Sequence, residues 1–293
     1  MPSTVFIING RSDTKKIQAV KQAVESFFEP HNFQIFLTEY GGHALDLTKK
    51  AISNGAQTIV AVGGDGTVNE ILQQVATEKI NLGVVPLGSG NGLARHCKIP
   101  LQIKDSVALI HAGHKSKIDI GLINNIYFIS NAGVGFDAFV CNTIKQANSR
   151  GLKMYFKYVI KHYFSYKASN YTIYIDEKKV EERAYFLNIA NGKEFGYGFK
   201  IAGQASIQDG LFDIIMVKKM DMLSATHFVF EGWRNRIRAN KNIALWNGKR
   251  IKIVSDKLTL FQADGDAHPC EGQCTIQILP NQLSLIVPQN TNL

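Results

Sequence analysis

Several features that would place this chain in a special class of protein are missing from its 293 residues. It has no apolar stretch of about 18 residues or more, so no membrane-spanning helix is expected. The segment from Met1 to Ile8 lacks the basic region and small-residue cleavage site of a secretory signal. Four cysteines in a chain of this length do not make a disulfide scaffold. We therefore expect a soluble, cytoplasmic protein.

The chain is rich in apolar residues and has an excess of basic ones. Apolar residues make up 45% of it and charged residues 19%, which predicts a folded protein, and its length predicts two domains of roughly 150 residues each. Lysine and arginine number 33 against 24 acidic residues, giving a net charge of +9. Such an excess favours partners that carry phosphate, namely nucleotides, nucleic acid or anionic lipid head groups.

Much of this excess lies in two segments. Residues 145–167 include six basic and no acidic residues, and residues 234–252 include seven and none. Each segment fits either a phosphate-bearing partner or a solvated basic face that serves solubility alone.

The first 90 residues alternate between strand and helix patterns. Short apolar runs at 5–8, 33–37, 58–62 and 82–85 predict strands, and apolar residues spaced by three and four predict helices at 17–27, 44–52 and 68–75. This alternation is typical of a parallel sheet covered by helices on both faces. Because ligands of such sheets bind beyond the carboxyl ends of the strands, the loops after Ile8, Leu37, Val62 and Val85 are candidate binding loops.

The pattern changes after about residue 122. Short alternating segments separated by turn residues predict an antiparallel sandwich or barrel, interrupted by helices at about 145–164 and 222–239. We expect a first domain at 1–122 and a second at 123–282. The last apolar run, 283–287, fits either domain, so 283–293 could return to the first.

One glycine-rich loop, Val62-Gly-Gly-Asp-Gly-Thr-Val-Asn-Glu70, separates a predicted buried strand from a predicted helix. Its glycines let the backbone approach a ligand closely, and the new helix presents free N–H groups suited to phosphate. An alternative is a structural turn with a capping box between Thr67 and Glu70. The carboxylate of Asp65 between glycines favours the binding role, because a cap alone does not require it.

A second glycine-rich loop, Pro86-Leu-Gly-Ser-Gly-Asn-Gly92, follows the next predicted strand. It matches neither the dinucleotide fingerprint nor the P-loop pattern. Two such loops on neighbouring strands are best explained by one phosphate-bearing ligand that lies across both.

These two motifs, preceded by Asn9-Gly-Arg-Ser-Asp13, resemble the diacylglycerol kinase catalytic-domain family, which includes bacterial lipid kinases and sphingosine and ceramide kinases. The resemblance continues in order through Lys117–Gly121, Asn131–Asp137, Asp209–Asp213 and Ala263–Asp266. It implies an N-terminal Rossmann-like parallel α/β nucleotide domain, a C-terminal antiparallel β-sandwich domain, and an active site in the cleft between them.

The resemblance also implies which residues bind ATP and a cation, and which residue acts as the base. Those expected to contact ATP are Asn9, Gly10, Arg11, Ser12, Asp13, Thr38, Gly64, Asp65, Gly66, Thr67, Val68, Asn69, Glu70 and Ser89. A cation would be held by Asp209 with the main-chain oxygens of Ser206 and Leu211. The general base corresponds to Asp266, with Asp264 as the alternative.

Phosphoryl transfer depends on positioning and on charge neutralisation, so the expected cofactors are ATP as co-substrate and Mg²⁺. Mg²⁺ takes oxygen ligands, and Asp65 is the natural candidate to reach it directly or through water. Asp137 is the candidate to meet the lipid head group; for both Asp119 and Asp137 a structural hydrogen-bonding role is the alternative.

The chain departs from the family pattern at Gly10, Gly92 and Asp266, where the family commonly has proline, an acid and glutamate. Two other functions therefore stay open: a soluble-metabolite kinase of the NAD kinase type, and a catalytically inactive nucleotide- or membrane-binding module. The expected partner is a lipid substrate rather than a nucleic acid, and a homodimer is left open.

Lysines at 153, 157 and 161 share one face of a predicted helix with aromatic residues between them. Such a helix can lie on an anionic membrane, here the inner membrane surface, although an ordinary domain helix with a solvated lysine face has the same pattern.

Overall fold

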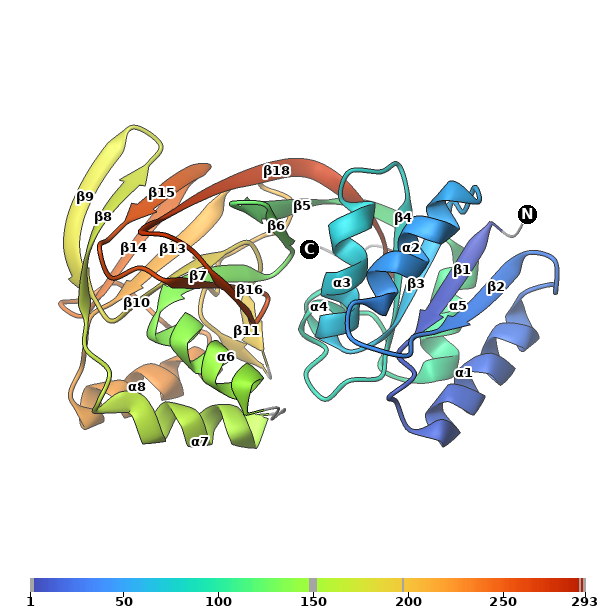
Figure 1. The fold of residues 1–293 in the computed structure, drawn as a ribbon, viewed down its shortest axis with the longest axis horizontal. Helices are drawn as coiled ribbons and strands as arrows, with labels where there is room; N and C mark the ends of the chain where they lie inside the picture. Colours follow the sequence, from blue (N-terminus) through green and yellow to red (C-terminus); the bar gives the residue numbers. More distant parts are fainter. Residues whose placement is uncertain (1–2, 148–151, 197, 290, 292–293) are drawn as a thin grey trace. The chain divides into compact units, whose positions relative to one another are not determined.

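The computed structural model describes residues 3–147, 152–196, 198–289 and 291, and its chain divides into two compact units. Unit 1 comprises residues 1–118 and 281–293, and unit 2 comprises residues 119–280. Figure 1 shows the course of the chain through both.

Unit 1 is built on parallel strands with helices between them. Its elements are β1 (Thr4–Ile8), α1 (Thr14–Phe27), β2 (Phe33–Leu37), α2 (His43–Ser53), β3 (Thr58–Gly63), α3 (Asp65–Val75), β4 (Asn81–Pro86), α4 (Gly92–His96) and α5 (Ile103–Ala112). The strand order β2-β1-β3-β4 is parallel throughout. The strands and helices predicted for the first 90 residues are therefore confirmed to within a few residues.

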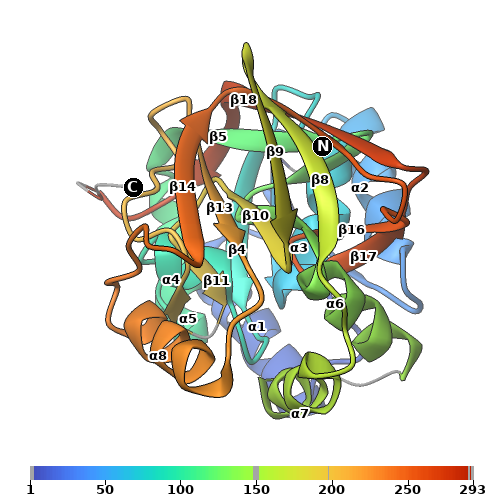
Figure 2. The same ribbon diagram turned by 90° about the vertical axis from the view of Figure 1, so that its left-hand side faces the viewer.

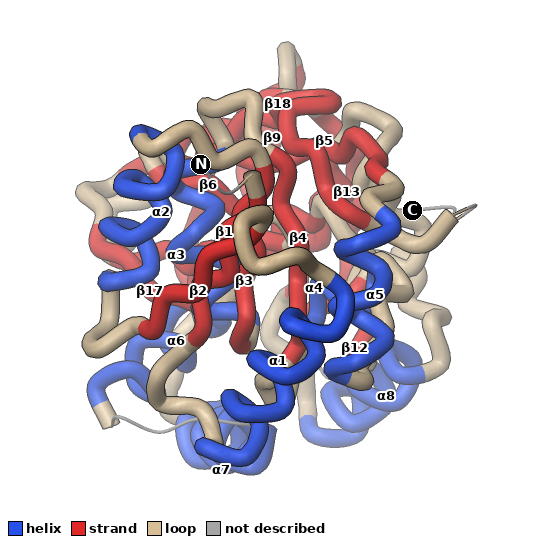
Figure 3. The backbone as a smooth tube through the Cα atoms, turned by 90° about the vertical axis from the view of Figure 1, so that its right-hand side faces the viewer, coloured by secondary structure: helices blue, strands red, loops and turns tan. Residues whose placement is uncertain are grey.

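Helices cover both faces of this sheet, as Figure 3 shows. Alternate strand residues such as Phe6, Ile8 and Val62 pack with Val24 of α1 and Val107 of α5 in one apolar cluster. On the other face α2 packs against α3. Because both faces are covered, only the ends of the strands and their loops are left for a ligand.

Unit 2 begins within β5 and is dominated by antiparallel strands. Its elements are β5 (Lys115–Ile123), β6 (Ile126–Phe128), β7 (Asn131–Gly135), α6 (Phe136–Gln146), α7 (Leu152–Tyr163), β8 (Ser169–Ile175), β9 (Lys178–Ala184), β10 (Phe186–Ala190), β11 (Glu194–Gly196), β12 (Phe199–Lys200), β13 (Phe212–Val217), α8 (Met222–Trp233), β14 (Ile243–Gly248), β15 (Arg250–Val254), β16 (Leu260–Ala263), β17 (Asp266–Pro269) and β18 (Gln273–Ile286).

Two antiparallel layers enclose the core of unit 2. One has the order β14-β13-β10-β7-β16-β17, and the other contains β18, β15, β8 and β9. A single apolar cluster joins side chains of both, such as Leu187 and Phe261 of the first with Ile173 and Ile253 of the second. Figure 2 shows these layers. The predicted antiparallel sandwich is confirmed.

Two details differ from the sequence predictions, and one that the sequence left open is settled. The helix expected at 145–164 is instead the end of α6 and a separate α7, and the side chain of Lys153 and residues 148–151 lie outside the described residues. The helix expected to reach 239 ends at Trp233, because Asn235 takes a left-handed backbone with φ of 58°. The run at 283–287, which the sequence left open between the two domains, lies in unit 1. Its residues 283–286 end β18, which pairs with β4 through Ser284 and Leu285.

Candidate functional site

The loops predicted to bind phosphate all follow the carboxyl ends of parallel strands in unit 1. The Asn9–Asp13 loop follows β1, Thr38 follows β2, Gly64 follows β3, and Ser89 lies in the loop after β4. Since parallel strands end at the same edge of their sheet, these loops share that edge.

Hydrogen bonds tie the first three loops together. Asn9 Nδ2 donates to Thr67 Oγ1 at 3.2 Å, and the backbone N–H of Gly10 donates to Thr38 Oγ1 at 3.2 Å. A Cβ on Gly10 would lie 2.1 Å from the carbonyl oxygen of Thr38, so this position, where the family commonly has proline, is closely packed against the β2 loop.

The two glycine loops touch at Gly64 and Gly88. A Cβ on Gly88 would lie 2.6 Å from the Cα of Gly64, a distance at which the backbone would have to move. The backbone N–H of Leu87 donates to the carbonyl of Gly63 at 2.8 Å. The absence of side chains therefore allows a direct backbone contact between the loops.

Asp65 joins the same two loops through its side chain. Its Oδ1 accepts a hydrogen bond from the backbone N–H of Gly92 at 2.8 Å, at the start of α4. Burial raises the pKa of Asp65, and backbone N–H groups of residues 91–93 act in the opposite direction. Gly92, where the family commonly has an acid, thus supplies a donor to Asp65.

Helix α3 begins at Asp65 without a side-chain cap, because its N-cap residue is Gly64. The capping-box alternative is wrong: Thr67 Oγ1 accepts from Asn9, and Glu70 Oε2 accepts from the backbone N–H of Ala44 at 3.3 Å. The amide end of an 11-residue helix therefore faces the loop, an arrangement that suits an anion.

The remaining predicted ATP residues differ in what their side chains do. Asp13 caps α1 by accepting from the backbone N–H groups of Lys15 and Lys16. Val68 is buried in the core, and Asn69 Oδ1 accepts from Gln73 Nε2 at 2.8 Å. Arg11 is exposed, Gly66 is the second residue of α3, and Ser89 lies in the loop after β4.

The predicted cation ligands of unit 2 lie in one turn before β13. Asp209 Oδ1 accepts from the backbone N–H of Leu211 at 3.0 Å. Asp119, which is fully buried, accepts from the backbone N–H of Gly210 at 2.7 Å, and its own N–H donates to the carbonyl of Ile207. Asp119 therefore has the structural role that the sequence left open.

The donors in this turn fit Mg²⁺ chemically, since a carboxylate and main-chain carbonyls are hard oxygen ligands. Burial and the neighbouring charge of Asp209 raise the pKa of Asp213, while the hydrogen bond from Asn247 Nδ2 acts in the opposite direction. Among the described residues, no three His, Cys, Asp or Glu side chains gather as a metal site, so any cation here depends on main-chain oxygens.

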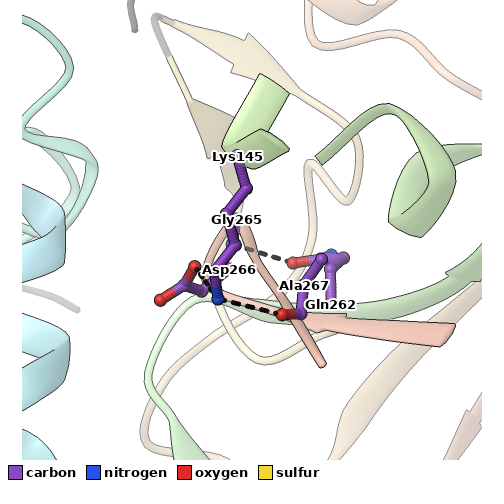
Figure 4. A network of polar contacts seen from close by, with 5 residues as sticks. All are labelled: Lys145, Gln262, Gly265, Asp266 and Ala267. Carbon is purple, nitrogen blue, oxygen red and sulfur yellow. Dashed lines mark hydrogen bonds and ion pairs between the residues drawn. The ribbon is translucent and has the colours of Figure 1, made fainter. Parts of the chain in front are cut away.

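Asp266 lies at the start of β17 beside a lysine that sequence reasoning missed. Lys145 Nζ lies 3.2 Å from Asp266 Oδ1 and also donates to the carbonyl of Ala267 at 3.2 Å, as Figure 4 shows. About half of each side chain of the ion pair is exposed. The carboxylate is therefore oriented and still accessible.

The turn before Asp266 is fixed by a buried polar network. Gln262 Oε1 accepts from the backbone N–H of Gly265 at 2.8 Å, while its Nε2 donates to Asp137 Oδ2 and to Asn131 Oδ1, each at 2.8 Å. Tyr155 OH donates to Asp137 Oδ1 at 3.4 Å. Burial raises the pKa of Asp137 to about 7.

Asp264 has a structural role in this turn. Its carboxylate accepts from the backbone N–H groups of Ile129, Ser130 and Asn131 at 2.8 to 3.0 Å, and its own φ is 47°. Three main-chain donors already bind its oxygens, so Asp266 is the better placed of the two carboxylates to accept a proton.

Lys145 and Gln262 contact the predicted site residues, although the sequence did not single them out. Lys145 follows Asp137 by eight residues and therefore lies on the same face of α6, where both reach the β16–β17 hairpin. The spacing of eight residues between Asp137 and Lys145 could have indicated that both lie on one helix face, but the sequence did not predict α6.

The fold consists of a parallel α/β unit with glycine-rich loops after its strands, followed by an antiparallel β-sandwich. The family profile described as the diacylglycerol kinase catalytic domain matches residues 3–123, and that described as the YegS C-terminal NAD kinase beta sandwich-like domain matches residues 130–287. The chain therefore belongs to the diacylglycerol kinase catalytic-domain family and carries the YegS C-terminal domain. Membership of this family supports a kinase activity and implies that ATP is the co-substrate.

Individual relatives agree with this assignment over the full chain. A protein of Yersinia pestis (strain Pestoides F) named "Probable lipid kinase YegS-like" is 29% identical over 300 residues, covering 99% of this chain and 98% of its own. A diacylglycerol kinase structure from Bacillus anthracis str. Sterne has a TM-score of 0.77 at 20% identity, covering 99% and 98%.

An NAD kinase from Archaeoglobus fulgidus in complex with ATP shares the fold more distantly, with a TM-score of 0.57 at 14% identity and coverage of 99% and 94%. In the described part of the chain, no helix is both long and apolar enough to cross a membrane.

Proposed function

We propose that this protein is an ATP- and Mg²⁺-dependent lipid kinase that transfers the γ-phosphate of ATP to the hydroxyl of diacylglycerol, a sphingoid base or a related lipid. The observation that carries the proposal is the backbone contact between the Gly64 and Gly88 loops, held by Asp65 and Gly92. The relatives named as probable lipid kinases favour a lipid over a soluble acceptor.

In this proposal the phosphates of ATP lie against main-chain N–H groups at the start of α3, between the two glycine loops. Asn9 and Thr38 hold the first loop at the same edge of the sheet, and Ser89 supplies a hydroxyl from the β4 loop. Asp65 acts by keeping the two loops together and so positions the phosphates.

The chemical step exchanges one phosphate–oxygen bond for another. The lipid hydroxyl oxygen bonds to the γ-phosphorus, the bond from that phosphorus to the bridging oxygen breaks, and ADP leaves. The hydroxyl proton passes to Asp266, which must lie about 3 Å from the hydroxyl. Lys145 orients the Asp266 carboxylate through the ion pair.

Mg²⁺, when bound with ATP, neutralises part of the charge that develops on the transferring phosphate. In unit 2, Asp209 with the main-chain oxygens of Ser206 and Leu211 would hold a cation that fixes the turn before β13.

Asp137 has 3% of its surface exposed, so we propose that it positions the turn before Asp266 through Gln262 instead of contacting a lipid.

The test is transfer of label from γ-labelled ATP with Mg²⁺, using a total lipid extract and NAD as separate acceptors. The proposal predicts a labelled product in the organic phase, whose identification names the lipid, and no labelled NADP. Label in NADP would establish the soluble-metabolite alternative. ATP binding without any labelled product would establish an inactive module.

A further inference from the structure

Exposed apolar side chains concentrate on two helices of unit 2. Among the described residues, six of the eleven large exposed hydrophobic side chains lie on α7, on α8 or one residue beyond α7. They are Ile160 (66% exposed), Phe164 (66%), Met222 (50%), Leu223 (86%), Phe230 (51%) and Trp233 (50%). The other five are spread over the remaining elements, so this concentration requires an explanation.

The two helices are neighbours and lie at the same end of unit 2, as Figures 1 and 2 both show. The ring centroids of Phe156 in α7 and Trp233 in α8 lie 5.9 Å apart. Tyr163 OH, at the end of α7, donates to the carbonyl of Met220, just before α8, at 2.8 Å. Contacts near both ends indicate that the helices run side by side.

Helix α7 already uses its aromatic face inside the unit. Tyr155, Tyr158, Val159 and Tyr163 pack against the cluster that contains Phe136 of α6. This packing exposes Lys157, Ile160, Lys161 and Phe164, which follow the i, i+3, i+4, i+7 spacing of one helix face. The outward stripe therefore alternates lysines with apolar residues, while the tyrosines of α7 pack inward.

Helix α8 presents a broader apolar face. Leu223, Phe230 and Trp233 are exposed on it, together with His227, while Ala225 and Phe228 pack inward. A globular helix normally exposes its polar face, so an outward apolar face indicates contact with another apolar phase.

Exposed basic residues accompany these apolar residues along the chain. Exposed basic residues on or close to the two helices include Lys157, Lys161, Arg234, Arg236 and Arg238. None of them takes part in the ion pairs of the described residues. Arg234 lies over the ring of Phe230, 5.1 Å from its centroid. Asp221, the N-cap residue of α8, accepts a hydrogen bond from the backbone N–H of Ser224. Within α8 itself the acidic residue is Glu231.

We propose that these apolar residues and the cations around them, here named the α7–α8 surface, insert into the interface of an anionic lipid bilayer. The charge complementarity favours anionic lipid, and protruding leucine, isoleucine and aromatic side chains suit the boundary between head groups and acyl chains. The inference rests on the proposed function in one respect, namely that a lipid kinase must reach its lipid substrate. It places the membrane contact on α8 as well as on α7, the helix that carries Lys157 and Lys161.

Vesicle binding tests the surface separately from catalysis. Co-sedimentation would use vesicles of phosphatidylcholine alone and of equal parts phosphatidylcholine and phosphatidylglycerol. The variant is Ile160→Gln with Leu223→Gln, which alters one exposed side chain on each helix without removing a core contact. Leu101→Gln, 44% exposed and in unit 1, is the matched control. Unchanged thermal unfolding would confirm that all three proteins are folded.

The α7–α8 surface predicts that the wild type binds the anionic vesicles about tenfold or more tightly than the neutral ones, and that the double variant loses about tenfold. The Leu101→Gln control should bind within about twofold of wild type. In a Trp246→Phe background, leaving Trp233 as the reporter, anionic vesicles should shift the emission to the blue.

Vesicle binding that is absent, or equal in the double variant and wild type, would overturn the surface proposal. If the double variant instead abolishes a concentration-dependent dimer, the surface is an interface between two copies, which also overturns it. Phosphorylation of a short-chain, water-soluble lipid acceptor should be unchanged in the double variant. Absence of that activity in the wild type would contradict the proposed function and not the surface.

Discussion

Asp65 Oδ1 and the backbone N–H of Gly92 lie 2.8 Å apart, and this hydrogen bond closes the loop after β3 against the loop after β4. It connects residues separated by 27 positions in the sequence. The two loops therefore form one backbone cradle, and their contact leaves no room for a side chain at Gly88.

Asp65→Ala should loosen this cradle. The partly buried N–H of Gly92 loses its acceptor, so the free energy of unfolding should fall by about 1–3 kcal/mol, and phosphate transfer should fall more than ATP binding. Urea unfolding and labelled-phosphate transfer measure the two effects. Asp65→Asn, which keeps an acceptor oxygen without the charge, should unfold within about 1 kcal/mol of wild type; a loss equal to that of alanine would refute the hydrogen-bond explanation.

Gly88→Ala should separate the two glycine loops, because its Cβ would meet the Cα of Gly64 at 2.6 Å. We expect affinity for an ATP analogue, measured calorimetrically, to fall by about tenfold or more, which corresponds to about 1.4 kcal/mol. Gly41→Ala is the control, since a Cβ there has no atom within 4 Å. Equal affinities in the two variants would show that the backbone contact does not shape the ATP site.

The stability of the protein should depend on pH through Asp137. Burial raises its folded pKa to about 7, above the unfolded value near 3.8, so the folded state holds the extra proton between these values. Stability contributed by this proton is present at low pH and is lost as pH rises towards 7. The slope is up to about 1.4 kcal/mol per pH unit.

Urea unfolding of wild type and Asp137→Asn at several pH values between 5 and 8 measures this effect. The stability of wild type relative to the variant should decrease up to about pH 7 and then level off. Parallel stability curves across this range would mean that Asp137 is already ionised in the folded protein.

Asp266→Asn should lower phosphate transfer by about a hundredfold or more with little change in stability. General bases typically contribute rate factors of about 10² to 10⁴, whereas an exposed ion pair such as that with Lys145 contributes at most about 1 kcal/mol. Steady-state transfer assays and thermal unfolding of the same preparation separate the effects. A variant with wild-type turnover would remove Asp266 from the mechanism.

The fold of unit 1 is predictable from the sequence because its signals are local. Each buried strand is a short apolar run followed by a turn and a helix with regular apolar spacing, as from Thr58 to Val75. The carboxyl ends of these strands also mark the candidate loops, because ligands of parallel sheets bind beyond them.

The signals fail where tertiary contacts decide the structure. Helix α6 starts at Phe136, and its N-cap residue Gly135 has a φ of +92° and no side chain, which gives no capping signal. The sequence pattern therefore assigns Lys145 to the wrong helix. Strand β18 contains Pro280 and Asn281, residues that usually end a strand, yet it continues by exchanging its partner β15 for β4. Gln262 interrupts an apolar strand in the sequence, and only the fold shows that it bridges Asp137 and Gly265.

The most direct test of the central claim is a crystal structure with magnesium and a non-hydrolysable ATP analogue. The account predicts the triphosphate against the main-chain N–H groups of residues 64–66, in contact with the loop that contains Gly88. A triphosphate bound elsewhere, or a cradle that stays empty at saturating nucleotide, would contradict it.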